Sequence, residues 1–250
     1  MDQLFPHRQE DVDPLDAYDV PDEVPVDRPY VVINMVSSLD GATAQDGVTA
    51  ALSSPGDKRV FFALRNIVDV VLVGATTVRT EGYGTVRVDE RSAARRQARG
   101  QHPVAALAIV SASLDLDWSS PLFTKATRRP FVIAPRSSDA ERLRQAAAAA
   151  ELVLAGEHRV DLRAAFAVLR SGHDVRTVLC EGGPTLNAQL VAAGLVDQLC
   201  LTFAPTVLGG DATPIFGRAA LREPPQLALA GVIEEDGHLL LRYQFPGASG

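Results

Sequence analysis

The sequence predicts an α/β fold: a mixed, mostly parallel sheet with helices on both faces and a C-terminal antiparallel hairpin. Two observations support this prediction. Nearly continuous apolar runs, such as Tyr30–Val36, are typical of strands that are buried on both faces, and they alternate with helical patterns along most of the chain. Near the C-terminus, Asp236-Gly237 lies between two strand-like runs, which indicates a tight hairpin.

The individual elements follow from local patterns. A helix is expected where Ser54 can cap and Pro55 occupies the first helical position, and another ends where Gly172 stops an apolar stripe. Strands are predicted at 30–36, 69–74, 104–110, 130–135, 151–154, 177–180, 198–204, 227–234 and 238–245. Helices are predicted at 54–68, 139–150, 162–172 and 184–194. We expect a loop or short helix at 75–84 and a surface segment at 85–102, whose arginines are solvated.

Composition limits the class of protein. The chain has 250 residues, of which 46% are hydrophobic and 22% charged, which suits one soluble globular domain or at most two small ones. Its net charge of −7 argues against a nucleic-acid partner, since such proteins usually carry a basic patch. No apolar run is long enough to cross a bilayer, and the N-terminus lacks the layout of a secretion signal. We therefore expect a cytoplasmic protein with no membrane partner.

The cysteines and histidines indicate neither a disulfide nor a metal site. Cys180 and Cys200 both fall in predicted buried strands, which favours reduced core residues over a disulfide. The five histidines are scattered, and no Cys/His spacing resembles a set of metal ligands. We expect no bound metal.

The chain is expected to divide into an arm and a domain. Residues 1–28 are acidic and proline-rich and cannot form a core alone, so we expect an extended arm lying over the domain or a partly disordered tail. Residues 29–250 show no internal repeat and no convincing linker, so we expect them to form one domain.

A phosphate site is indicated where a buried strand leads through Gly182 and Gly183 into a helix. Pro184 suits the first helical position, and the two glycines leave the free N–H groups of the helix start uncovered. The alternative is a tight strand-to-helix connection without a ligand. Glu181 lies between the buried strand and the glycines, where a carboxylate suggests a second ligand that carries hydrogen-bond donors.

Three further polar segments, at 37–43, 74–84 and 135–138, follow apolar strands. Ligands of open α/β sheets bind beyond the carboxyl ends of the strands, so parallel strands would bring these segments to one edge. Each residue in them also has a simpler explanation. The hydroxyls of Thr76 and Thr77 can bind a ribose or phosphate, or they can cap a helix.

The same choice applies to three other residues. Asp40 can contact a substrate, or it can form a turn with Gly41. Arg136 can clamp an additional phosphate or be an exposed arginine. Tyr83 can stack on a flat ring or pack within its own loop.

Four segments, in this order, resemble the reductase domain of riboflavin biosynthesis, which belongs to the dihydrofolate-reductase-like fold. The segments are Ser37–Gly41, Asp69–Val78, Glu181–Leu186 and Pro205–Asp211. The similarity runs from about residue 28 to residue 245. A glycine-rich helix start followed by a strand and then Leu-Gly-Gly is the most specific part of it.

The resemblance implies an NADPH-dependent reductase that acts on a phosphoribosylamino-pyrimidine, converting the ribosyl group to a ribityl chain, and that forms a homodimer. Glu181 and Asp40 are then the candidate catalytic residues, with Asp40 or a water as the proton donor. The candidate substrate-binding residues are Ser37, Glu81 and Tyr83. The candidate cofactor-binding residues are Ser53, Gly74, Thr76, Thr77, Arg136, Gly182, Gly183, Pro184, Thr185 and Leu186.

The chain departs from the resembling proteins at two points. No His-x-Glu with Pro-Cys-x-x-Cys occurs, so the zinc deaminase domain of the two-enzyme version is missing and we expect a stand-alone reductase. Many relatives have Ala-Asp-Asp-Pro where this chain has Thr80-Glu-Gly-Tyr83. Two alternatives therefore stay open: a dihydrofolate or pterin reductase on the same fold, and a non-catalytic NADPH-binding protein.

Overall fold

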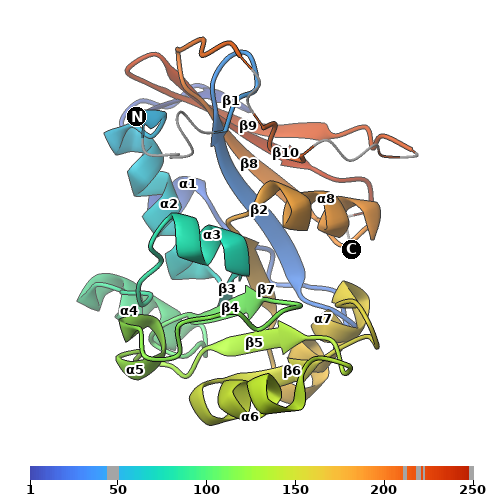
Figure 1. The fold of residues 1–250 in the computed structure, drawn as a ribbon. Helices are drawn as coiled ribbons and strands as arrows, with labels where there is room; N and C mark the ends of the chain where they lie inside the picture. Colours follow the sequence, from blue (N-terminus) through green and yellow to red (C-terminus); the bar gives the residue numbers. More distant parts are fainter. Residues whose placement is uncertain (44–50, 211–212, 218–220, 222, 248–250) are drawn as a thin grey trace. The chain divides into compact units, whose positions relative to one another are not determined.

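The chain folds into two units, each built from strands flanked by helices (Figure 1). The structure is a computed structural model that describes residues 1–43, 51–210, 213–217, 221 and 223–247. Unit 1 comprises Met1–Glu23, Val31–Leu64 and Cys180–Gly250, and unit 2 comprises Val24–Tyr30 and Arg65–Leu179.

Unit 1 contains the antiparallel part of the fold. Its strands are β1 (Asp2–Phe5), β2 (Tyr30–Ser37), β8 (Gln198–Phe203), β9 (Ala228–Glu235) and β10 (His238–Gln244), in the spatial order β1-β9-β10-β8-β2. Strands β2 and β8 pair in parallel, whereas the other neighbours pair antiparallel. Asp236 and Gly237 connect β9 to β10 with φ angles of 50° and 78°, so the predicted hairpin is confirmed.

The helices of unit 1 are α1 (Pro14–Ala17), α8 (Pro184–Ala192) and most of α2 (Pro55–Ile67), whose last residues belong to unit 2. The predicted start of α2 is confirmed, because the hydroxyl of Ser54 accepts a hydrogen bond from the Asp57 N–H at 3.1 Å. The N-terminal residues pack in this unit: β1 pairs with β9, and Tyr18 is 2% exposed.

Unit 2 contains the parallel strands. These are β3 (Val70–Gly74), β4 (Ala106–Val110), β5 (Phe131–Ala134), β6 (Glu151–Leu154) and β7 (Thr177–Cys180, its last residue in unit 1), in the order β7-β3-β4-β5-β6. Strands β3 to β6 are parallel throughout. The helices are α3 (Ala75–Thr80), α4 (Glu90–Ala98), α5 (Pro121–Thr124), α6 (Ala140–Ala149) and α7 (Leu162–His173). The predicted mixed sheet with flanking helices is confirmed.

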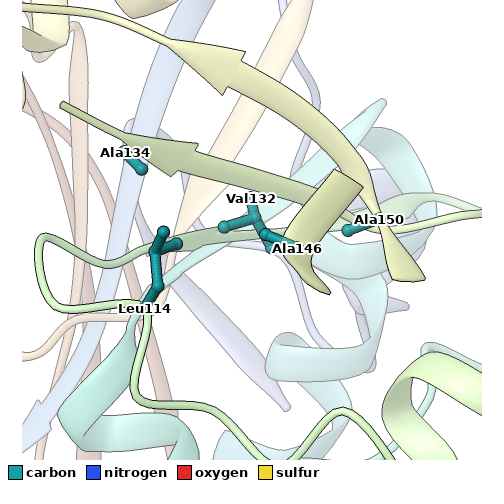
Figure 2. Packing of buried hydrophobic residues seen from close by; sticks show 5 residues of the cluster. All are labelled: Leu114, Val132, Ala134, Ala146 and Ala150. Atoms are coloured by element: carbon teal, nitrogen blue, oxygen red, sulfur yellow. The ribbon is translucent and has the colours of Figure 1, made fainter. Parts of the chain in front are cut away.

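One core cluster of unit 2 lies between β5 and α6. Figure 2 shows Val132 of β5 beside Ala146 of α6, with Ala134 farther along β5, Ala150 after that helix and Leu114 in the loop after β4. All five residues are at most 2% exposed. Ala146 of α6 and Ala150 at its C-cap therefore pack closely against the sheet, whereas Ala140, Ala147 and Ala148 are exposed.

Two local predictions were wrong. The segment at 85–102 is not a purely solvated one, because Arg96 on α4 is 1% exposed. Helix α7 does not stop at Gly172 but continues to His173, and its C-cap Asp174 adopts a left-handed conformation with φ of 50°. An aspartate tolerates this conformation better than most residues do, so glycine is not required there.

The expected boundary between an arm at 1–28 and a domain at 29–250 stays a prediction. Within the described residues, no helix combines the length and apolar character that a bilayer span requires.

Candidate functional site

The connection from β7 to α8 is built around Glu181 and two glycines. Glu181 is 8% exposed at the end of the strand, and Gly182 has a φ of 95°, which strongly favours glycine. The peptide bond between Gly182 and Gly183 is cis. A Cβ atom on Gly182 would lie 3.4 Å from the Met35 Sδ, so a side chain here would also approach β2.

The start of α8 presents uncovered backbone donors. Its N-cap, Gly183, has no side chain to accept from the helix, and Pro184 takes the first helical position as predicted. In the described part of the chain, the N–H groups of Thr185 and Leu186 have no acceptor. Such a helix start has the donors and the dipole orientation that an anion requires.

Asn187 was missed by the sequence-based prediction. Its side chain is fully buried, accepts from the Cys180 thiol at 3.4 Å and donates to the Ile215 carbonyl at 2.9 Å. It therefore ties α8 to both β7 and the segment around Ile215. The signal was a single amide on the apolar side of a short helix, where an unpaired polar group would be costly.

The two cysteines are buried thiols without a disulfide, as predicted. Burial, with a smaller contribution from the charge of neighbouring Glu181, raises the pKa of the Cys180 thiol to about 12. Burial likewise raises the pKa of the Cys200 thiol to about 11. Neither cysteine is a nucleophile at neutral pH, since the thiolate is the reactive form.

Asp40 joins two of the segments that carry the resemblance. Its carboxylate accepts hydrogen bonds from the Ser38 hydroxyl at 2.5 Å, the Leu208 N–H at 3.2 Å and the Gly209 N–H at 2.6 Å. These donors, led by Ser38, lower the pKa of Asp40 to about 2. Asp40 is thus ionised at neutral pH and holds the Leu-Gly-Gly segment; Asp211, the last residue of that motif, lies outside the described residues.

The hydroxyls of Ser37 and Ser53 are engaged within unit 1. Ser37 is 2% exposed and donates to the Ser38 carbonyl at 3.0 Å. Ser53 donates to the Asp57 carboxylate at 2.5 Å, next to the start of α2. Both hydroxyls already donate their proton within the protein. To contact a ligand as predicted, each would have to accept a hydrogen bond or give up its present partner.

Three predicted cofactor-binding residues lie at the start of α3. Gly74 is the N-cap and offers no side chain, while Thr76 and Thr77 lie in the first turn. The Thr76 hydroxyl accepts from the Arg79 guanidinium at 3.4 Å. The N-cap is Gly74, so helix capping does not explain the two threonines.

Glu81 and Tyr83 follow α3 directly. Glu81 is the exposed C-cap, and its N–H donates to the Thr77 carbonyl at 2.9 Å. The Tyr83 ring is half-buried, with the Arg65 guanidinium 5.7 Å from its centroid. This ring is therefore held by a cation–π contact, which sequence reasoning missed.

Arg136 lies in the loop after β5 and is exposed. Its N–H donates to the Gly156 carbonyl of the next loop at 3.0 Å. Within the described residues, no group of three His, Cys, Asp or Glu side chains could hold a metal ion. The predicted site residues are thus divided between the two units.

Residues 29–241 match the RibD C-terminal domain family. The chain belongs to this family. The predicted resemblance to a riboflavin-biosynthesis reductase domain is thereby confirmed.

Individual relatives are similar to the chain over most of its length. The chain is 29% identical over 189 residues to the 2,5-diamino-6-ribosylamino-4(3H)-pyrimidinone 5′-phosphate reductase of Archaeoglobus fulgidus, covering 75% of this chain and 85% of that protein. It is 32% identical over 187 residues to the protein of that name from Methanothermobacter thermautotrophicus, covering 73% and 81%. A solved structure, of a pyrimidine reductase-like protein from Corynebacterium diphtheriae, superposes with a TM-score of 0.81 at 26% identity, covering 94% of this chain and 99% of that chain.

Proposed function

We propose that this protein is an NADPH-dependent reductase that acts on a phosphoribosylamino-pyrimidine and produces the ribityl compound. The single observation that supports this proposal most strongly is the β7–α8 connection. There, a buried carboxylate on Glu181 precedes a helix start whose N–H groups are uncovered. The relatives that match 75% and 73% of the chain are named 2,5-diamino-6-ribosylamino-4(3H)-pyrimidinone 5′-phosphate reductase.

The residues present fit a nicotinamide cofactor. Thr185 and Leu186 would donate their backbone N–H groups to the diphosphate, and the glycines leave no side chain in the way. In unit 2, the hydroxyls of Thr76 and Thr77 in the first turn of α3 are further candidate donors to a ribose or phosphate group. When bound, the reduced cofactor supplies the hydride.

Glu181 orients the substrate in this proposal. Its carboxylate would accept hydrogen bonds from the amino or ring N–H groups of the pyrimidine. The ribosylamine opens to an imine, whose carbon accepts the hydride and whose nitrogen accepts a proton. Orientation of this kind reduces the barrier because the reacting atoms are already near contact distance.

The proton comes from water in this proposal. Asp40 has its pKa lowered to about 2 by its three donors and therefore carries no proton at neutral pH. Its role is to hold the segment around Leu208 and Gly209 beside the Ser37–Gly41 turn. Water was one of the two donors that the sequence left open.

The proposal includes a homodimer. One face of the antiparallel strands in unit 1 carries apolar side chains that no described segment fully covers. Leu239, Leu241 and Tyr243 alternate along β10, and Tyr243 pairs with Leu229 of β9. Leu229 and Leu239 are 40% and 38% exposed. A second copy of this face would cover them. The two free thiols fit a cytoplasmic location.

The test is NADPH oxidation, followed by absorbance, with the phosphoribosylamino-pyrimidine as substrate. Glu181→Gln should lower kcat about 10- to 100-fold, as expected for the loss of hydrogen bonds to a charged group. The Kd for NADPH should stay within about twofold. Glu223→Gln, which removes an exposed glutamate of the same unit, is the matched control and should keep full activity.

Three outcomes contradict the proposal or a part of it. Oxidation with dihydrofolate and none with the pyrimidine would point to folate-type reduction. NADPH binding without turnover of either compound would point to a non-catalytic binding protein. If Glu181→Gln changes only the Kd for NADPH, the Glu181 carboxylate does not bind the substrate.

A further inference from the structure

Three loops at the carboxyl ends of parallel strands in unit 2 are tied to one another. The loop after β5 is bonded to the loop after β6, because the N–H groups of Arg136 and Ser137 donate to the carbonyls of Gly156 and Glu157, each at 3.0 Å. The loop after β4 joins them through the Ser138 hydroxyl, which donates to the Ala112 carbonyl at 3.3 Å. These loops form one surface at the edge where open α/β sheets bind ligands.

A serine orients a histidine on this surface. The Ser137 hydroxyl donates its proton to the Glu157 carbonyl at 2.8 Å and lies 3.0 Å from the Nδ1 of His158. Since the hydroxyl has no second proton, His158 must donate from Nδ1 in that contact. The Nε2 atom is then left for a ligand. In the imidazolium form both ring nitrogens carry protons, so Nε2 can then donate to a phosphate oxygen.

An arginine without a partner lies in the same pair of loops. The Arg136 backbone is fixed by its bond to Gly156, but its guanidinium makes no hydrogen bond or ion pair with any described residue. The nearby acids Asp139 and Asp161 already accept from the first turns of α6 and α7. Among the described residues, the Arg136 guanidinium therefore forms no ion pair with Asp139, Asp161 or Glu157, and its donors stay available to a ligand.

We propose that Arg136 and His158 form a binding site for a phosphomonoester, with Ser137 as the residue that positions His158. A guanidinium offers two parallel N–H donors to phosphate oxygens, and an imidazolium adds a third donor from the neighbouring loop. The inference rests on the proposed function for its ligands. Both the 2′-phosphate of NADPH and the 5′-phosphate of the ribosyl substrate are phosphomonoesters.

The test measures binding directly by isothermal titration calorimetry with two probes, adenosine 2′-monophosphate and ribose 5-phosphate, and with adenosine and ribose as phosphate-free counterparts. Arg136→Met should raise the Kd of the relevant probe about tenfold or more, and His158→Gln should raise it by a smaller factor. Arg144→Met, which removes an exposed arginine of α6, is the matched control and should leave both Kd values unchanged.

The two sources of the phosphate are distinguished by the probe that responds. If Arg136→Met loses affinity only for adenosine 2′-monophosphate, and its KM rises for NADPH but not for NADH, the site binds the 2′-phosphate of the cofactor. If the variant loses affinity only for ribose 5-phosphate, the site binds the 5′-phosphate of the substrate. If the wild type and Arg136→Met bind both probes with equal Kd values, the proposed phosphate site is wrong. It is also wrong if the wild type binds neither probe better than its phosphate-free counterpart. Because no turnover is required, failure of the reductase assay would contradict the proposed function and leave this result standing.

Discussion

Arg96 gives the sharpest prediction about stability. It is 1% exposed, its Nε donates to the His102 carbonyl at 2.8 Å, and its Nη1 donates to the carbonyls of Asn66 at 3.1 Å and Val68 at 2.6 Å. One side chain of α4 therefore satisfies carbonyls at the end of α2 and just beyond it. Arg96→Met keeps the length and the apolar stem but leaves these three acceptors unpaired.

The magnitude follows from those contacts. A hydrogen bond to a charged group contributes about 1.5–3 kcal/mol, and leaving a buried acceptor unpaired costs about 1–3 kcal/mol. The contributions do not add fully, because removing the guanidinium also removes its desolvation cost; the Nη2 atom is buried without a partner among the described residues. We expect Arg96→Met to lower the free energy of unfolding by about 3–5 kcal/mol.

Urea unfolding followed by circular dichroism measures this loss. The control is Arg91→Met, which removes the same charge from an exposed position on the same helix and should cost less than about 1 kcal/mol. If the two variants unfold within about 0.5 kcal/mol of each other, the three carbonyl contacts do not stabilise the fold and the reasoning fails.

Two further predictions concern single aspartates. The pKa of Asp40 is lowered to about 2, so its hold on the Gly209 N–H is complete above the ordinary aspartate pKa of about 4 and is lost as the pH falls through 2. The amide shift of Gly209 in NMR spectra should titrate with a midpoint near 2, whereas a midpoint near 4 would show that the bonds to Ser38, Leu208 and Gly209 do not form. Asp174→Gly should stabilise the protein by about 0.5–1 kcal/mol in thermal unfolding, since glycine adopts the left-handed C-cap conformation without cost. A lower stability would mean that the exposed ion pair of Asp174 with Arg170, at 3.2 Å, outweighs that relief.

The order of elements was predictable because it depends on short-range patterns. Buried strands such as β7 appear as apolar runs, helix starts such as Ser54 appear as a capping residue followed by proline, and the Asp236-Gly237 turn appears as a dipeptide. The start of α8, with its uncovered donors, was predictable for the same reason: two glycines and a proline can be recognised without knowing what surrounds them.

The pairing of distant groups was decided only by the tertiary structure. Nothing near Asp40 in the chain indicates that its carboxylate binds the N–H groups of Leu208 and Gly209, and that pairing changes it from a candidate proton donor into an ionised tether. In the sequence, Arg96 cannot be distinguished from the solvated arginines around it. Only the fold places its guanidinium beside the carbonyls of Asn66 and Val68. A hydrogen bond depends on position in space, and residues far apart in sequence come within 3 Å only after the chain has folded.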